Sequence, residues 1–244
     1  MKITFLGVGE AFDENTPNNS HLIVTEKTKL LLDCGYSIPQ QLWKFNSDPN
    51  FLDAIYISHQ HSDHFFGLYP ILMRMWEDGR KRDFFIISQK DLIDFMNYAY
   101  KGFLEKFKYK INVIKVKEGE SISFQDLSLS FQKTVHSGEN FAIKVTDNKK
   151  TMAYSGDGSP VPGSDFYKDL DLLILETYLY DKEIIGHSSI VSGIKFAKDN
   201  NAKCLALTHI NRDLRKNELS KIKEKIKSES LKIIVPEPME EYSF

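Results

Sequence analysis

The sequence has few cysteines, no long hydrophobic run and almost no net charge. Its 244 residues include two cysteines, Cys34 and Cys204, each in an apolar segment. A disulfide-stabilised fold is therefore excluded, and buried free thiols in a reducing cytoplasm are expected. No apolar run approaches the roughly 18 residues needed to cross a bilayer, so we expect no membrane association. The N-terminal segment is broken by Gly7 and Gly9 and is typical of a strand and turn, not of a signal peptide.

Charge and composition exclude two further classes of protein. The 32 Lys and Arg residues and 34 Asp and Glu residues give a formal charge of −2, which argues against a broadly basic nucleic-acid-binding protein. Hydrophobic residues make up 41% of the chain and aromatic residues 12%, enough to build a core, so a disordered chain is excluded. Because no linker or low-complexity segment interrupts the sequence, residues 1–244 are expected to form a single domain.

Apolar and β-branched runs separated by turn residues predict a chain rich in strands. Strands are expected at residues 3–9, 21–25, 29–35, 52–59, 84–88, 111–116, 121–125, 127–136, 140–146, 151–157, 170–177, 204–209 and 231–236. Helices are expected at residues 38–46, 61–76, 91–107, 188–200 and 214–228. The second of these helices should break near Pro70. Each half of the chain has several strands followed by strand–helix units, which predicts two similar sheets packed face to face with helices outside.

Histidine and aspartate are concentrated in one short segment. Three of the seven histidines lie within six residues, in the pattern HxHxDH formed by His59, His61, Asp63 and His64. In an extended segment His59 and His61 point to the same side, because strand side chains repeat every two residues. Imidazole nitrogens and carboxylate oxygens are ligands that zinc takes in proteins. The pattern therefore predicts a metal site at the end of a strand; the alternative is a run of solvated loop histidines.

Three further residues lie at the ends of predicted strands: His136, Asp157 and His209. A lone histidine at a strand end is more often an ordinary polar or core residue than a metal ligand. The prediction rests on their joint placement, since six of the seven histidines lie at a strand end or in a loop.

In this order and placement, the HxHxDH motif at 59–64 followed by His136, Asp157 and His209 resembles the metallo-β-lactamase fold hydrolases. The segment Leu32–Gly35 is similar to the strand end that precedes the motif in that family. The resemblance covers most of the chain and implies an α/β (α+β) protein with a four-layer αββα sandwich, in which two mixed sheets pack face to face with helices outside.

The resemblance also implies a ligand set for two divalent metal ions. The ligands would be divided as follows: His59, His61 and His136 for the first ion, Asp63, His64 and His209 for the second, and Asp157 bridging both. Asp63 is expected to be catalytic as well, and Asp33 to support the site without binding a metal. A hydroxide between the two ions would be the nucleophile. Zinc is the expected metal, although the same ligands suit manganese and iron.

His187 favours one branch of this family. It lies in Gly186–Ser189, just before a predicted helix, and is similar to the HST motif of ribonuclease Z and its phosphodiesterase relatives. The resemblance implies that His187 contacts the scissile phosphate and helps to protonate the leaving oxygen. Ribonuclease Z carries a HEAT segment on the preceding strand; here Leu175 replaces its histidine, whereas Glu176 is kept and can orient His187. The alternatives are that His187 and Ser188 cap the helix and that Glu176 is a surface residue.

The substrate is expected to be smaller than tRNA. Ribonuclease Z grips tRNA with a long arm inserted between the ligands that correspond to His136 and Asp157, but here these residues are only 21 positions apart. tRNA is therefore not an expected partner. A small phosphodiester is favoured: a cyclic nucleotide, a cyclic phosphate or a short nucleic-acid end. Ribonuclease Z-like proteins are often dimers, so the resemblance is compatible with a homodimer.

Three functions remain open at this stage. The leading prediction is a cytoplasmic, dinuclear metal-dependent phosphodiesterase. The alternative is a lactonase or thioesterase of the same fold, which uses the same ligands and does not need His187. A non-catalytic binding protein of this fold would be expected to have lost ligands, whereas all seven are present.

Two other groups of residues have more than one interpretation. Phe65, Phe66, Tyr69, Met73, Met75 and Trp76 all lie in the segment 65–83. They can line a substrate pocket and stack on a base, but helical spacing explains most of them as core residues. Arg80, Lys81 and Arg82 are interpreted as solvated charge.

Overall fold

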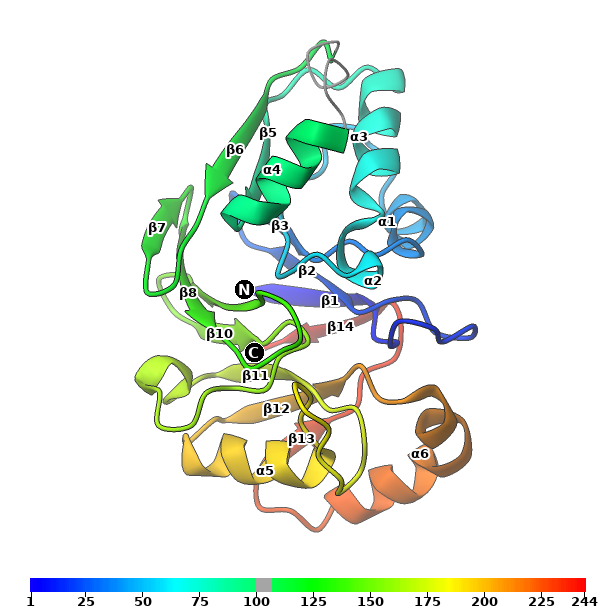
Figure 1. The fold of residues 1–244 in the computed structure, drawn as a ribbon, viewed down its shortest axis with the longest axis vertical. Coiled ribbons are helices and arrows are strands. Elements are labelled where there is room, and N and C mark those ends of the chain that lie inside the picture. The colour runs from blue at the N-terminus through cyan, green and yellow to red at the C-terminus, as the bar shows by residue number, and fades with distance from the viewer. Residues whose placement is uncertain (100–106) are drawn as a thin grey trace.

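The structure, a computed structural model, describes residues 1–99 and 107–244, and its strands form two sheets of seven (Figure 1). In hydrogen-bonded order, the first sheet contains β14 (Glu240–Ser243), β1 (Lys2–Gly7), β2 (Ser20–Val24), β3 (Lys29–Leu32), β4 (Ala54–Tyr56), β5 (Phe84–Ser88) and β6 (Ile111–Lys115). The second contains β13 (Lys232–Ile234), β12 (Cys204–Thr208), β11 (Leu172–Glu176), β10 (Thr151–Tyr154), β9 (Phe141–Thr146), β8 (Leu127–Lys133) and β7 (Ser121–Phe124).

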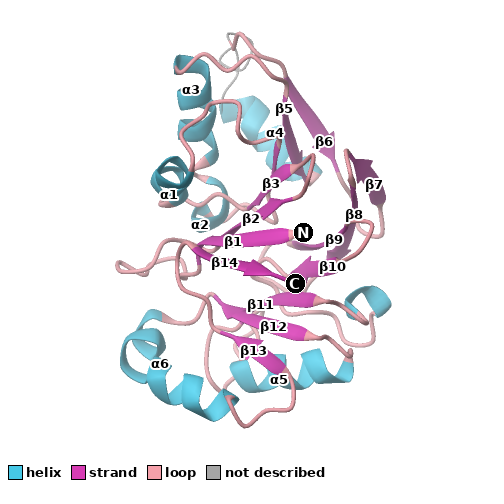
Figure 2. Cartoon of the chain, turned by 180° about the vertical axis from the view of Figure 1, so that it is seen from behind, coloured by secondary structure: helices cyan, strands magenta, loops and turns pink. Residues whose placement is uncertain are grey.

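Helices cover the outer face of each sheet (Figures 1 and 2). The first sheet is covered by α1 (Ile38–Phe45), α2 (Ser62–Phe65), α3 (Leu68–Glu77) and α4 (Lys90–Ala99). The second is covered by α5 (Ile190–Asp199) and α6 (Arg212–Ile226), with a short 3-10 helix at Asp165–Tyr167. The predicted αββα sandwich is confirmed. Within the described residues, no helix has the length and apolar character that a membrane crossing requires.

Alternating side chains explain why both faces of each sheet are covered. On β11, Leu172 and Ile174 belong to the core between the two sheets, whereas Leu173 and Leu175 pack beneath α5 and α6. All four are fully buried, as expected for a strand with helices on one face and a sheet on the other. The polar residues that follow such strands are not part of this core, so they are available to form a site at the edge of the sheet.

Most of the expected elements are present, but several are shorter than predicted. The strands expected at 52–59 and 127–136 end at Tyr56 and Lys133, so His59 and His136 lie in the loops that follow. The predicted helix at 61–76 breaks between Phe65 and Leu68, near Pro70 as expected. Pro70 itself falls in the first turn of α3, where its missing amide needs no partner. α4 begins at Lys90, and residues 100–106 of the helix predicted at 91–107 lie outside the described residues. Strand β14 was not predicted.

The interpretation of Arg80 as solvated charge is wrong. Its side chain is only 2% exposed, and its guanidinium lies over the Phe84 ring. The guanidinium donates hydrogen bonds to four backbone carbonyl oxygens, at 2.7–2.9 Å, which belong to Pro49, Leu52, Arg82 and Asp83. Arg80 therefore joins the loop before β4 to the loop before β5.

We expect Arg80→Met to lower the free energy of unfolding by about 3 kcal/mol, because it leaves buried carbonyl oxygens without donors. Lys81→Met is the matched control, since Lys81 is exposed, and should change stability by less than about 0.5 kcal/mol. Urea denaturation of both variants tests this. Equal stability of the two variants would show that Arg80 does not hold these loops together.

Candidate metal centre

The candidate site lies at the edge of the sandwich where several strands end. β10, β11 and β12 are parallel neighbours, so the residues that follow them come together at one edge of the second sheet. Asp157 follows β10 and His209 follows β12. β3 and β4 are parallel neighbours in the first sheet, and their ends carry Asp33 and the segment 57–64. The two sheets thus contribute opposite walls of one site.

The HxHxDH segment is fixed on the end of β3 by backbone contacts. The Cys34 amide donates a 2.6 Å hydrogen bond to the His64 carbonyl, and the Gly67 amide donates a 2.8 Å bond to the Cys34 carbonyl. A Cβ atom at Gly35 would lie 1.9 Å from the Asp63 carbonyl oxygen. Only glycine at position 35 therefore allows the turn that carries Asp63 and His64 to approach the strand so closely.

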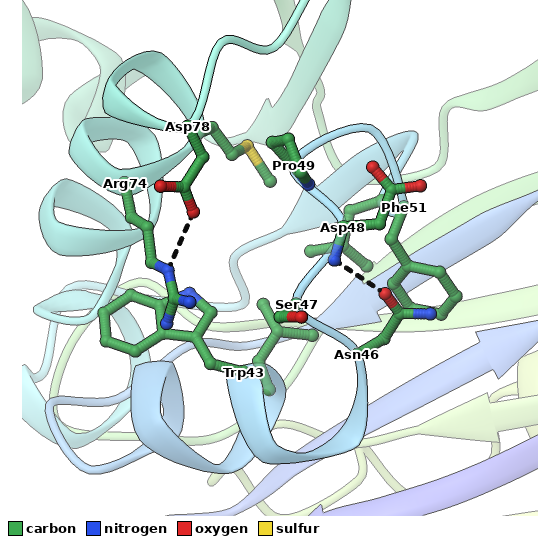
Figure 3. Close-up of a pocket in the computed structure, with 11 residues that line it drawn as sticks. Trp43, Asn46, Ser47, Asp48, Pro49, Phe51, Arg74 and Asp78 are labelled. Atoms are coloured by element: carbon green, nitrogen blue, oxygen red, sulfur yellow. Dashed lines mark hydrogen bonds and ion pairs between the residues drawn. The ribbon is translucent and has the colours of Figure 1, made fainter.

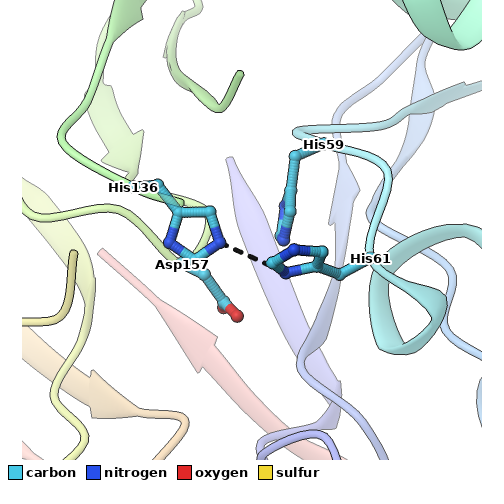
Figure 4. A group of neighbouring side chains, drawn as sticks. All are labelled: His59, His61, His136 and Asp157. Atoms are coloured by element: carbon cyan, nitrogen blue, oxygen red, sulfur yellow. Dashed lines mark hydrogen bonds between the residues drawn. The ribbon is translucent and has the colours of Figure 1, made fainter. Parts of the chain in front are cut away.

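One group of site residues consists of three histidines and an aspartate (Figure 4). Candidate ligand atoms of His59, His61, His136 and Asp157 all lie within 4.8 Å of one another. His136 Nε2 is 3.2 Å from His61 Nδ1, and the His136 Nδ1 atom is 3.3 Å from the Gly186 carbonyl oxygen. These four residues come from loops after β4, β8 and β10, and Figure 4 shows their side chains converging.

A second group shares Asp157 with the first. Asp63, His64, Asp157 and His209 are all buried, and their candidate ligand atoms also lie within 4.8 Å of one another. Asp157 Oδ1 is 3.0 Å from His64 Nε2, and Asp157 Oδ2 is 3.1 Å from His209 Nε2. Asp63 Oδ2 lies 3.2 Å from His64 Nε2 and 3.5 Å from His209 Nε2. The structure thus gathers the seven predicted ligands into the two expected groups, with Asp157 in both; their role as ligands stays a prediction.

The donor atoms of both groups fit divalent metal ions. Several of them are buried and have no hydrogen-bond partner among the described residues outside the two groups: His59 Nε2, His64 Nε2, His209 Nε2, Asp63 Oδ2 and Asp157 Oδ1. Buried polar atoms are normally paired, so a cluster of nitrogen and oxygen atoms that have only one another as neighbours is suited to a shared cation. Imidazole nitrogen and carboxylate oxygen are the donor types expected for zinc, manganese or iron.

The buried carboxylates of the second group also require positive charge close to them. Burial alone favours neutral rings, but the Asp157 charge and hydrogen bonds to Asp157 and Asp63 raise the pKa of His209 to about 10. Burial by itself would raise the pKa of Asp157, yet the charges of His209 and His64 hold that pKa well below its usual range. The buried carboxylates are thus balanced by protonated imidazoles when no cation is present. A bound cation would take over that role and leave the imidazoles neutral, as metal ligation requires.

Asp33 supports both groups through hydrogen bonds, as the sequence predicted. Its carboxylate accepts 2.7 Å bonds from the Ser58 amide, the Ser58 hydroxyl, the Tyr154 hydroxyl and the Nδ1 atom of His64. The Ser58 hydroxyl is in turn 3.0 Å from His59 Nδ1. Asp33 itself has a left-handed backbone with φ 58°. Ser58 and Tyr154 were missed by the sequence analysis, since Tyr154 reaches Asp33 from the opposite sheet.

His187 and Glu176 form a pair beside the two groups. The His187 Nδ1 atom is 2.8 Å from Glu176 Oε1, and the rings of His187 and His209 are stacked with centroids 6.2 Å apart. Glu176 is fully buried, so the surface interpretation is wrong. The helix-cap interpretation of His187 and Ser188 is also wrong: Ser189 caps α5 by accepting a hydrogen bond from the Ser192 amide.

His21 and the segment 65–83 do not contribute ligand atoms to either group. His21 is fully buried between the rings of Phe5 and Tyr154, and burial followed by the charge of His64 lowers its pKa to about 3, so it is a neutral core residue. Phe65 and Met75 belong to the core beneath α1–α4, which confirms core packing for these two residues of the segment 65–83.

A hollow between α1 and α3 is too small to be the substrate site (Figure 3). Its volume is about 20 Å³, which is room for a water molecule. The Arg74 guanidinium lies over the Trp43 ring there and pairs with Asp78 at 3.0 Å. None of the seven predicted ligands lines this hollow.

Metal analysis tests the two groups separately. After loading with zinc or manganese and dialysis, we expect about two ions per chain in the wild type, about one in His136→Ala, and close to none in Asp157→Ala, because Asp157 belongs to both groups. Inductively coupled plasma mass spectrometry gives these ratios. Arg74→Gln is the control, since Arg74 lies in the hollow of Figure 3 with none of the predicted ligands, and should keep two ions. Two retained ions in Asp157→Ala would contradict the shared position of this carboxylate.

Asp33→Asn should weaken metal binding about 10- to 100-fold without removing a ligand, because it alters the hydrogen bonds that orient His64 and His59. Tyr154→Phe removes one of the four bonds and should have a smaller effect. Competition with a chelator measures both affinities. If Asp33→Asn bound metal with wild-type affinity, these hydrogen bonds would not contribute to metal affinity.

Comparisons with known proteins agree with this fold. The chain is 27% identical over 220 residues to "Probable metallo-hydrolase YhfI" of Bacillus subtilis (strain 168), covering 86% of this chain and 87% of that protein. It is 25% identical over 265 aligned positions to "Ribonuclease Z" of Saccharolobus solfataricus, covering 86% and 89% of the two chains. The crystal structure of YhfI superposes with a TM-score of 0.85 at 24% identity, covering 99% and 98%. That of the short form of human tRNase Z superposes with a TM-score of 0.79 at 24% identity, covering 100% and 99%.

These relatives identify the protein as a hydrolase of the metallo-β-lactamase fold on the ribonuclease Z-like branch, which confirms the resemblance found in the sequence. The family model described as "Anti-Pycsar protein Apyc1" matches residues 1–228. The chain therefore belongs to the Apyc1 family of anti-Pycsar proteins.

Proposed function

We propose that this hydrolase is a dinuclear metal-dependent phosphodiesterase that acts on a small phosphodiester: a cyclic nucleotide, a cyclic phosphate or a short nucleic-acid end. The observation that carries the proposal is the His187–Glu176 pair beside the two candidate metal groups. The alternative, a lactonase or thioesterase, uses the same two groups and gives no reason for a histidine–glutamate pair at this position. A protonatable imidazole held next to them is what departure of an alkoxide from phosphorus needs.

The position of His187 suits proton transfer at its Nε2 atom. Glu176 fixes the ring through Nδ1, and Nε2 has no hydrogen-bond partner among the residues that the structure describes. The ring lies 5.4 Å from that of His136 and 6.2 Å from that of His209, measured between centroids. His187 is therefore adjacent to ligands of both groups and can move a proton at the reacting oxygen.

Burial influences the two partners in opposite ways. It raises the pKa of Glu176 well above its usual value and lowers the pKa of His187. Both changes favour a hydrogen bond in which one proton is shared between Nδ1 and the carboxylate. Glu176 thereby orients the ring and stabilises its protonated form when Nε2 takes up a proton, as in other histidine–carboxylate pairs.

The two metal groups would supply the remaining chemistry. When bound, a pair of divalent ions provides a water of lowered pKa and positive charge next to the phosphoryl oxygens. His59, His61, His136 and Asp157 would hold one ion, and Asp63, His64, Asp157 and His209 the other. Asp63 would act on the reacting water as well, because its buried carboxylate belongs to the second group, with Oδ2 3.2 Å from His64 Nε2.

The short connection between His136 and Asp157 favours a small substrate. These residues are connected by β9, β10 and their turns, and no further element extends from this part of the structure. The relatives named ribonuclease Z belong to a class whose name denotes phosphodiester cleavage in RNA. The short connection favours the same chemistry on a molecule smaller than tRNA.

Hydrolysis of bis(p-nitrophenyl) phosphate by the zinc- or manganese-loaded protein tests the proposal. We expect turnover that depends on about two bound ions per chain. With a 3′,5′-cyclic nucleotide, whose leaving group is an alkoxide, His187→Ala should lose roughly 100- to 10,000-fold in kcat with the metal content unchanged; the loss with bis(p-nitrophenyl) phosphate should be smaller, because p-nitrophenolate leaves without a proton. Glu176→Gln should lower kcat less than His187→Ala, since it leaves the imidazole in place. Arg74→Gln, in the distant hollow of Figure 3, is the control and should retain wild-type turnover.

Two results would contradict the proposal. If the protein binds two ions but does not hydrolyse the phosphodiester, lactones and thioesters become the substrates to examine. If His187→Ala loses metal together with activity, His187 is a ligand, as its place in a group with Glu176 and His209 allows, and it does not act as proposed.

A further inference from the structure

A second feature of the site lies at its rim, where the loop after β1 meets the start of α6 (Figures 1 and 2). The His209 amide donates a 2.9 Å hydrogen bond to the Val8 carbonyl, and Gly9 and Ile210 form a parallel bridge. A Cβ atom at Gly9 would lie 2.4 Å from the Thr16 carbonyl oxygen, so glycine lets the loop fold back at this point. The loop is thus attached to the segment that carries a predicted metal ligand.

Arg212, the first residue of α6, is held by this loop. Its Nη1 atom donates to Oε1 of Glu10, a carboxylate only 2% exposed. Its guanidinium carbon is 5.7 Å from the centre of the Phe12 ring. Glu10 Oε2 accepts a 3.2 Å bond from the Phe12 amide, and the Tyr36 hydroxyl donates to the Ala11 carbonyl. The loop therefore presents an arginine and an aromatic ring in a defined arrangement.

Both groups remain accessible although their backbone is fixed. Phe12 is 70% exposed, and the Arg212 side chain is 38% exposed. Apart from the Glu10 contact, the guanidinium donates no hydrogen bond among the described residues. It therefore has N–H groups left for a ligand, and the Phe12 ring has a free surface on which a second ring can stack.

Tyr178 connects this pair to the candidate metal centre. Its ring lies 5.3 Å from the His187 ring and 6.3 Å from the His209 ring, between centroids. Its carbonyl oxygen accepts a 2.9 Å bond from the amide of Asn211, the residue before Arg212. Because Arg212 is also three residues after His209, it lies within about 11 Å of that residue along the backbone. At this separation, one small molecule can contact the His209 region at one end and Arg212 at the other.

The charge around the loop distinguishes between possible ligands. Arg212 is already paired with Glu10, and Asp13 and Glu14 follow in the same loop, where residues 10–16 contain no Lys or Arg. The rim therefore carries no excess of positive charge, which a second phosphate or a longer nucleic acid would need. An uncharged ring with hydrogen-bond acceptors fits better, since it can stack on Phe12 and accept from the guanidinium.

We propose that Phe12 and Arg212 form a subsite for a planar, uncharged, hydrogen-bond-accepting ring of the substrate, such as a heterocyclic base, while its phosphodiester occupies the metal centre. This inference rests on the proposed phosphodiesterase function. Phe12 supplies the stacking surface, Arg212 donates to ring oxygen or nitrogen atoms, and Glu10 positions the guanidinium. The subsite selects substrates that carry one phosphate and one ring.

Equilibrium binding to the metal-loaded protein tests the subsite without requiring turnover. The probes are the four common nucleoside 5′-monophosphates and ribose 5-phosphate, which lacks the ring, measured by isothermal titration calorimetry. We expect at least one nucleotide to bind about tenfold more tightly than ribose 5-phosphate, as base stacking on an aromatic side chain provides. Phe12→Leu and Arg212→Gln should each bring this affinity ratio close to one.

Trp43→Leu and Arg74→Gln are matched controls. Trp43, Arg74 and Asp78 have the same aromatic–arginine–carboxylate arrangement but lie in the hollow of Figure 3, away from the predicted ligands, so both variants should keep the wild-type ratio. Arg212→Lys keeps the positive charge next to Glu10 and replaces Arg212→Gln as the test variant if Arg212→Gln unfolds. It too should reduce the ratio of nucleotide affinity to ribose 5-phosphate affinity, because an ammonium group lacks the planar arrangement of donors of a guanidinium.

Three outcomes would overturn the subsite. The first is a wild-type ratio near one for all four nucleotides. The second is a ratio that survives both Phe12→Leu and the Arg212 variants. The third is an equal loss of affinity for nucleotide and ribose 5-phosphate in the Arg212 variants, which would place Arg212 on the phosphate. Failure of the proposed function is a separate result: no hydrolysis of bis(p-nitrophenyl) phosphate while the ring-dependent ratio is retained.

Discussion

The site depends on the burial of carboxylates between two sheets. Asp157 comes from the second sheet, Asp63 from a turn on the first, and both are nearly inaccessible to water. A buried carboxylate without a positive partner is strongly destabilising, so the surrounding residues must supply positive charge. His64 and His209 lie on either side of Asp157 at 3.0 and 3.1 Å and meet that need from both sheets. The same requirement makes the cluster a suitable place for cations.

A network behind the ligands maintains this arrangement. Asp33 and His209 both have left-handed backbone conformations, with φ 58° and 56°, which are unfavourable for residues other than glycine. Such conformations persist only where surrounding contacts fix them, and here the contacts come from Ser58, Tyr154 and the Val8 carbonyl. Tyr154 joins the sheets directly, because it reaches from β10 to a carboxylate at the end of β3. The candidate metal centre is therefore part of the packing between the sheets.

The ligand set and the rim have different roles in determining function. The histidines and aspartates are compatible with several hydrolytic reactions, since the metallo-β-lactamase fold supports many substrates with one type of centre. In the functions proposed above, His187, which is held by a buried glutamate, would narrow the type of reaction, and the loop after β1 with the start of α6 would narrow the shape of the substrate. These elements are not adjacent in the sequence. They meet because β1 joins the first sheet, β11 and β12 join the second, and all three end at the same edge.

The sequence alone was sufficient for the layers and most strands, and its resemblance to a known family implied the division of the seven predicted ligands into two groups. Hydrophobic periodicity depends only on local geometry, and the HxHxDH motif carries four of the ligands within six residues. The sequence did not indicate that Tyr154 supports Asp33, that Arg80 is a buried connection between loops, or that Phe12 lies against Arg212. Each of these contacts joins residues distant in the chain or reverses the usual exposure of a charged side chain. Local pattern determined which residues could reach the edge of the sandwich, whereas only the packing of the two sheets decided which of them touch.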